Sequence, residues 1–140
     1  RPANIFVASF LGSPPINYLH GKLKQNGDHV SFVNDNVRFA LDASTIARIG
    51  SRPEKVVLGI RPEDVQITTA GGNVIEGLVD SVLPVGSDRF LGLKINGSDF
   101  FIRVGKEARF AEGERIAFSP VPERVHVFDG DSGKNIAGAS

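Results

Sequence analysis

Histidine is the side chain in this sequence best suited to bind a metal ion, and the chain has three, His20, His29 and His126. A zinc site in a protein takes its ligands from Cys and His residues at short, fixed spacings. The three histidines lie far apart in the sequence, and the chain contains no cysteine. The pattern therefore predicts ordinary strand or surface histidines, no metal site and no thiolate chemistry.

Two short motifs near the C-terminus start like ligand-binding loops but lack the residues that would complete them. The stretch beginning at Asp129 resembles a calcium loop, which needs oxygen ligands at positions 1, 3 and 5, Gly at 6 and Glu at 12. Positions 5, 6 and 12 hold Gly133, Lys134 and Ser140. Around Gly133 and Lys134, a phosphate-binding loop would need a Gly five residues before Gly133 and a hydroxyl after the Lys, but those positions hold Phe128 and Asn135. We predict a solvated acidic segment with no bound cofactor.

Carboxylates that could act as general acid and base occur as Glu63-Asp64 and as Glu112 with Glu114. Each pair is near Gly or Pro in a polar segment, where acidic residues are typical of turns. Acid–base catalysis needs paired carboxylates that share a cleft. The serines do not lie in a nucleophile-elbow motif either. The sequence therefore predicts no catalytic residue in this chain.

Charge is balanced over the 140 residues, with 16 Lys and Arg against 16 Asp and Glu. Nucleic-acid-binding domains usually have a basic excess or a basic stripe, because phosphate contacts supply most of their affinity. Here basic residues are scattered among acidic ones, which predicts no nucleic-acid partner. Single-strand binding by Phe100 or Phe101 is the weakest alternative and would require salt-sensitive affinity.

Most of the sequence is typical of short β-strands separated by tight turns. Two Asn-Gly pairs, at 26–27 and 96–97, predict hairpins. Gly77 predicts a bulge inside a long strand, Pro84 predicts its end, and one helical turn could begin after Asp42 or Ser44. Strands are expected at 18–24, 29–33, 37–41, 56–60, 65–67, 74–83, 89–95, 100–104, 115–119 and 124–128. So many short strands predict an all-β barrel or sandwich.

The chain begins with Arg1 and contains no Met, so we expect it to be a processed or excised piece of a longer protein. Phe6 and Phe10 lie at helical spacing before a Gly and two prolines, which predicts a short helix. Pro53 divides the remainder, and the last residues are rich in Gly and Ser. We expect a linker helix from a preceding domain at 1–12, a first β unit at 13–53, a second at 54–130 and a flexible tail at 131–140.

Several stretches resemble one protein family. RPANIFVASFLGSPPIN at 1–17 is similar to the segment that follows the nucleotide-binding domain in ATPases of carbohydrate ABC importers, and LGIRPEDV at 58–65 resembles their GIRPE element. Residues 79–93 and 118–128 also fit that family. The chain thus resembles the C-terminal regulatory domain of the ATP-binding subunit in the maltose and sn-glycerol-3-phosphate importer class.

The resemblance implies an all-β, OB-like (TOBE/MOP-like) barrel built from two small β units with one short N-terminal helix. It also implies a cytoplasmic parent subunit, peripheral on the inner face of the bacterial plasma membrane, that hydrolyses ATP with Mg²⁺ in a separate nucleotide-binding domain. Expected partners are a second copy, that nucleotide-binding domain, the membrane subunits and a regulatory protein. The nucleotide-binding motifs of the family have no match here, so we expect no ATP hydrolysis by this chain.

Four residues of the resembling element match the family motif, and we expect them to act in a structural turn: Gly59, Arg61, Pro62 and Glu63. The alternative function is a small-ligand module for an oxyanion or a sugar, as in related barrels that take up molybdate. Its candidate residues are Gly86, Ser87 and Arg89, although Asp88 between them opposes an anion.

Overall fold

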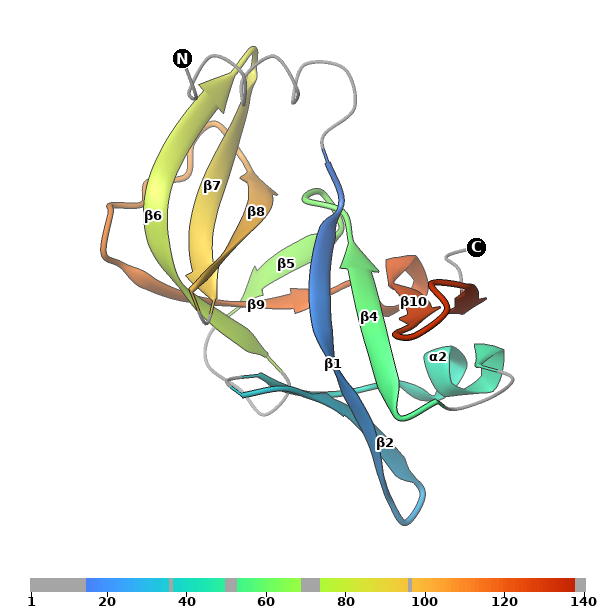
Figure 1. Ribbon diagram of the computed structural model, residues 1–140. Coiled ribbons are helices and arrows are strands. Elements are labelled where there is room, and N and C mark those ends of the chain that lie inside the picture. The colour runs from blue at the N-terminus through green and yellow to red at the C-terminus, as the bar shows by residue number, and fades with distance from the viewer. Residues whose placement is uncertain (1–14, 36, 50–52, 69–73, 96, 138–140) are drawn as a thin grey trace.

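The computed structural model describes residues 15–35, 37–49, 53–68, 74–95 and 97–137 (Figure 1). The helix predicted at 1–12 lies outside the described residues. The described chain forms two antiparallel β-sheets, one with six strands and one with five. This arrangement confirms the predicted all-β class.

The first sheet has the strand order β11-β10-β4-β1-β2-β3. One helix, α2 (Ala43–Arg48), follows its edge strand β3, and begins after Asp42, whose Oδ1 accepts a hydrogen bond from the backbone N–H of Thr45 at 3.1 Å. Asp42 is therefore the N-cap, one of the two residues that the sequence suggested. The strands are β1 (Asn17–Asn26), β2 (His29–Val33), β3 (Arg38–Ala40), β4 (Lys55–Ile60), β10 (His126–Asp129) and β11 (Asn135–Ala137).

The second sheet has the order β5-β9-β6-β7-β8. Figure 1 shows β6, β7 and β8 beside one another at one end of the molecule, while the β1–β2 hairpin extends from the other end. A short 3₁₀ helix, η1 (Pro122–Arg124), leads from this sheet back to β10. The strands are β5 (Val65–Thr68), β6 (Ile75–Val85), β7 (Asp88–Ile95), β8 (Ser98–Val104) and β9 (Arg115–Pro120).

Hairpins form at both predicted places in the chain. In the first, Asn26 pairs with His29, and Gly27 adopts φ of +63°, a left-handed conformation that glycine tolerates without strain. In the second, Ile95 pairs with Ser98 across the turn between β7 and β8. These two turns fix the register of the strands on either side.

Strand β6 departs from the prediction at two places. It continues through Pro84 to Val85, so the turn is formed by residues 86–87. Strand β9 pairs with β6 only at residues 75–78. At Pro84, therefore, β9 offers no carbonyl group that would need a backbone N–H as its hydrogen-bond donor, and the proline is tolerated. The irregularity in register falls between Val79 and Ser81 and not at Gly77.

Residues of the second predicted unit complete the first sheet. Strands β4, β10 and β11 all follow residue 53, and buried side chains of both sheets form one hydrophobic cluster. The tail prediction is corrected for residues 135–137, which pair with β10 as β11. The Gly- and Ser-rich stretch before β11 forms a turn, because Asp129 Oδ1 accepts from the backbone N–H of Asp131 at 2.8 Å and of Ser132 at 3.0 Å.

Candidate functional site

The predicted family turn lies where the chain leaves β4 of the first sheet for β5 of the second. The backbone N–H of Asp64 donates to the carbonyl oxygen of Arg61 at 3.0 Å, which closes the turn. The carbonyl oxygen of Pro62 accepts from Arg103 N–H on β8 at 2.9 Å, and that of Asp64 accepts from Val121 N–H at 2.8 Å. The turn is thus held to two other segments through its backbone.

The side chains of this turn differ in exposure. Pro62 is buried, whereas Arg61 and Glu63 are exposed. The pKa of Asp64 is raised, because burial disfavours its charge and Glu63 lies close by, although Arg124, Arg61 and His126 act in the opposite direction. The exposed pair is available to solvent, while the buried proline fixes the backbone of the turn.

Gly59, the other matching residue, lies inside β4, where neighbouring side chains approach its backbone closely. A Cβ at this position would lie 3.0 Å from Ile16 Cδ1 and 3.0 Å from Phe128 Cε2. Gly59 pairs with Tyr18 of β1 on one side and with His126 of β10 on the other. The absence of a side chain therefore lets Phe128 of β10 and Ile16, which precedes β1, approach the backbone of β4 closely.

A buried amide beside the turn joins the two sheets. Asn17, which is 6% exposed, donates from Nδ2 to the carbonyl oxygen of Ile60 at 3.0 Å. The same Nδ2 donates to the carbonyl oxygen of Phe101 on β8 at 2.8 Å, and Phe101 N–H donates to Asn17 Oδ1 at 2.8 Å. No local pattern in the sequence indicates this role of Asn17, because its partners Ile60 and Phe101 are distant in the chain.

The predicted ligand candidates lie on a different hairpin. Gly86 and Ser87 form the exposed turn between β6 and β7, and Gly86 has φ of +60°. Arg89 is half-buried and donates from Nη1 to the carbonyl oxygen of Ala108 at 2.9 Å. Asp88 is exposed beside them. No hydrogen bond or ion pair joins this described hairpin to the described residues 59–63, but Arg103, whose N–H donates to Pro62, pairs with Phe90 beside Arg89.

Aromatic side chains gather on the outward face of the first sheet, and we call Tyr18, His20, Val57, His126 and Phe128 the aromatic surface. The rings of Tyr18 and Phe128 meet edge to face with centroids 6.2 Å apart, and His126 stacks on Phe128 at 6.1 Å. Tyr18 is 54% exposed. Their common face follows from the register of β1, β4 and β10, which the sequence pattern alone does not give.

The described residues were compared with the requirements of a metal site and of a membrane-spanning helix. The histidines and carboxylates there do not cluster in a group that could hold a metal ion. None of the helices in the described part of the chain combines the length and the apolar character needed to span a membrane.

Comparison with known families gives two matches. The model of the TOBE domain matches residues 50–128, and the model of the MalK OB fold domain matches residues 12–65. Both matches include residues 59–63, and together they extend over both sheets.

Known proteins match the chain over nearly its whole length. It is 32% identical to the trehalose/maltose import ATP-binding protein MalK of Thermococcus litoralis, over 97% of this chain and 38% of the relative. It is 31% identical to the sn-glycerol-3-phosphate import ATP-binding protein UgpC of Chromobacterium violaceum, over 100% of this chain and 37% of the relative. The chain thus spans less than two fifths of the length of these relatives.

A solved structure illustrates the shared fold. The molybdate-bound form of the cytoplasmic molybdate-binding protein ModG superposes with a TM-score of 0.58 at 16% identity. The match covers 79% of this chain and 94% of that protein. At this level of identity the likeness supports the fold and carries no conclusion about ligands.

Proposed function

Because this chain belongs to the TOBE domain family, whose model matches residues 50–128, we propose that it is the regulatory and dimerisation domain of an ABC importer's ATP-binding subunit. The parent subunit would power the import of a sugar or a related polyol phosphate. Its relatives are named as import ATP-binding proteins for trehalose/maltose and for sn-glycerol-3-phosphate. The proposed location is the cytoplasmic face of the membrane, where the parent would contact the membrane subunits.

The observation that carries the regulatory part is the aromatic surface. Protein interfaces are enriched in aromatic residues at their centres, and exposed Tyr side chains are frequent anchors. Tyr18 is exposed and Phe128 half-buried beside it on a rigid three-strand platform. A regulatory protein could therefore contact this surface without any rearrangement of the sheet.

Two features support a role in transmitting movement. The turn at residues 61–64 and the amide of Asn17 tie the first sheet to β8 of the second. A domain tied in this way moves as one body, as rigid-body coupling requires. Two such domains that stay in contact would keep their ATPase domains at a high effective concentration.

The chemistry of ATP hydrolysis would belong to another part of the parent. This sequence has no phosphate-binding loop, and its described acidic and histidine residues form no metal-binding cluster. ATP and Mg²⁺ would therefore bind in a separate nucleotide-binding domain. This chain would contribute the contacts of regulation and dimerisation.

Sedimentation equilibrium of the 140-residue chain over a wide range of concentration tests the dimerisation part. We expect reversible self-association, and a chain that stays monomeric at every concentration contradicts it. Tyr18→Ser tests whether the aromatic surface, proposed above for a regulatory protein, also forms the dimer contact, with Leu78→Ser as control because Leu78 is also exposed, at 42%, on the second sheet. An assay of phosphate release completes the test, since ATP hydrolysis by this chain alone would contradict the assignment.

A further inference from the structure

Four basic side chains gather on the outward face of the first sheet, although they come from three strands. The register places Lys22 of β1 directly beside Lys55 of β4 on one side and Val33 of β2 on the other. Arg38 of β3 is the next partner of Val33 in the same row. Directly paired residues point to the same side of a sheet, and so do residues two apart on one strand, which adds Lys24.

We call Lys22, Lys24, Arg38 and Lys55 the basic face. Lys22 Nζ forms an ion pair with Glu54 Oε2 at 3.7 Å. Asp35 is the acidic residue that lines the same described groove. Four basic side chains against these two acidic ones leave a net of two positive charges, whereas the whole chain has a formal net charge of zero.

This concentration of charge opposes folding. Like charges directly opposite each other on neighbouring strands destabilise a sheet, and Lys22 lies directly opposite Lys55. The Lys22–Lys55 pair therefore does not stabilise the fold, and the ion pair of Lys22 with Glu54 offsets only part of the repulsion. An anion bound from outside would relieve the repulsion, which makes the basic face a candidate binding surface.

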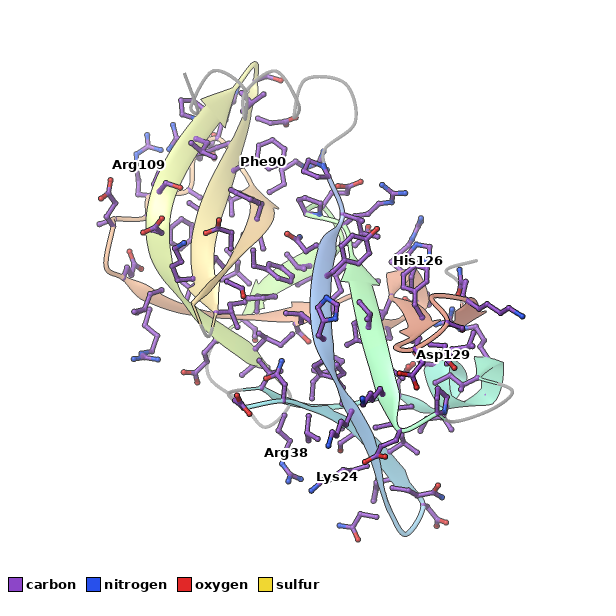
Figure 2. The ribbon with its side chains drawn as sticks, viewed as in Figure 1. Lys24, Arg38, Phe90, Arg109, His126 and Asp129 are labelled. Atoms are coloured by element: carbon purple, nitrogen blue, oxygen red, sulfur yellow. The ribbon has the colours of Figure 1, made fainter. Side chains whose placement is uncertain are left out.

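The basic face lines an open groove of about 970 Å³, which also contains His20 and Asn34. All four basic side chains are exposed, and that of Lys22 retains 55% of its accessible surface despite the ion pair. Figure 2 shows Lys24 and Arg38 projecting from β1 and β3 at the same end of the first sheet, far from Phe90 and Arg109. The groove is thus accessible to a large partner.

We propose that the basic face binds an acidic, extended polypeptide segment of a partner protein. Neighbouring strands lie about 4.8 Å apart, so the row from Lys55 to Arg38 spans about 14 Å, and Lys24 lies about 7 Å further along β1. A single phosphate or sulfate would contact only part of this area, and the groove is open. An extended acidic chain presents carboxylates about 7 Å apart on one side, which matches the spacing of Lys22 and Lys24.

Single-stranded nucleic acid has the same charge but needs free aromatic rings on which its bases can stack. The neighbouring rings are engaged with one another, since Tyr18 meets Phe128 edge to face and His126 stacks on Phe128. The observations therefore favour a polypeptide. The proposal goes beyond the regulatory and dimerisation role, because neither dimer formation nor transmission of movement requires a basic surface.

The test measures binding of a fluorescein-labelled deca-glutamate peptide to the 140-residue chain by fluorescence anisotropy at low and at physiological salt. Lys22→Gln with Lys55→Gln should weaken binding about fivefold, since each exposed charge pair contributes only modestly to affinity. The matched control, Lys94→Gln with Lys106→Gln, removes the same charge from the second sheet and its following loop and should change the affinity less than about twofold. Added salt should weaken binding to the unmodified chain.

Folding of each variant is checked by circular dichroism, and removal of the Lys22–Lys55 repulsion should leave thermal stability unchanged or higher. Lys24→Gln with Arg38→Gln provides a second, independent measurement on the same face, with the same expected loss. Three results would overturn the proposal: no binding of the peptide, equal loss in the control variant, or tighter binding of an oligothymidylate of equal charge.

Discussion

Asn17 and Phe101 form a reciprocal pair of hydrogen bonds, in which the side-chain amide of Asn17 contacts both backbone polar groups of Phe101. Nδ2 donates to the carbonyl oxygen at 2.8 Å, and Oδ1 accepts from the N–H at 2.8 Å. The amide thereby replaces a neighbouring strand along the outer edge of β8, next to the bond from Arg103 N–H to Pro62. An edge covered in this way is protected from pairing with other chains.

Replacing Asn17 should destabilise the domain by removing one of the hydrogen-bonded contacts between the sheets. Asn17→Ala leaves the partly buried carbonyl oxygen and N–H of Phe101 without this partner, and we expect a loss of about 2 kcal/mol in the free energy of unfolding. Gln66→Ala, at an exposed position on β5, is the matched control and should change it by less than about 0.5 kcal/mol. Urea unfolding measures the free energy of unfolding of both variants. Equal stability of the two would show that the Asn17 amide does not stabilise the fold.

Gly59 and Gly105 allow a matched test of the crowded position inside β4. In Gly59→Ala the new methyl group would lie 3.0 Å from Ile16 Cδ1 and from Phe128 Cε2, so these side chains must move, and we expect a loss of about 1–2 kcal/mol. Around Gly105 a methyl group would meet nothing within 4 Å. Gly105→Ala should therefore be neutral or slightly stabilising, by up to about 0.5 kcal/mol. Thermal unfolding distinguishes the two, and an unchanged midpoint for Gly59→Ala would contradict the close packing.

Local sequence signals predicted the local structure well. The Asn-Gly pairs identified two hairpins, and Asp42 was one of two suggested caps for the single helical turn. Such signals act over a few residues, where backbone preference and turn chemistry decide the conformation. The prediction of a flexible tail was wrong at 135–137, because the polar residues after Asp129 form a turn that returns the chain to β10.

Contacts between distant strands could not be predicted in the same way. The alternation along β1 shows that Lys22 and Lys24 share a face, but it does not show that Lys55 lies beside Lys22. That neighbour depends on the order of strands in the sheet, which a period of two residues leaves open. For the same reason, neither the aromatic surface nor the basic face is visible in a sequence whose basic residues are scattered among acidic ones.

We expect that the hairpin at residues 86–89 does not bind oxyanions tightly. Arg89 uses one guanidinium donor on the carbonyl oxygen of Ala108, and the exposed carboxylate of Asp88 repels anions. Calorimetric titration with molybdate and with sulfate should therefore show no micromolar binding. Micromolar binding that is lost in Arg89→Ala would instead favour the alternative function, a small-ligand module.

Asp42 should make the stability of the domain depend on acid pH. Burial raises the pKa of Asp42, but hydrogen bonds from the Thr45 and Ser44 side chains and from the backbone N–H of Thr45 outweigh it, so the pKa is lowered in the folded state. A lowered carboxyl pKa means that the charged form stabilises the fold. This contribution is complete above the unfolded pKa of about 4 and is lost as the pH falls through the folded value.

Two substitutions separate the charge of Asp42 from its role as helix cap. Asp42→Ala should lower the free energy of unfolding by about 1 kcal/mol at neutral pH, since an N-cap is removed from α2. Asp42→Asn keeps a cap oxygen without the charge, so its deficit should be smaller and should disappear at low pH. Urea unfolding from pH 7 to pH 3 measures both differences. A deficit of Asp42→Asn that stays constant as the pH falls below about 4 would show that ionisation of Asp42 does not contribute to stability.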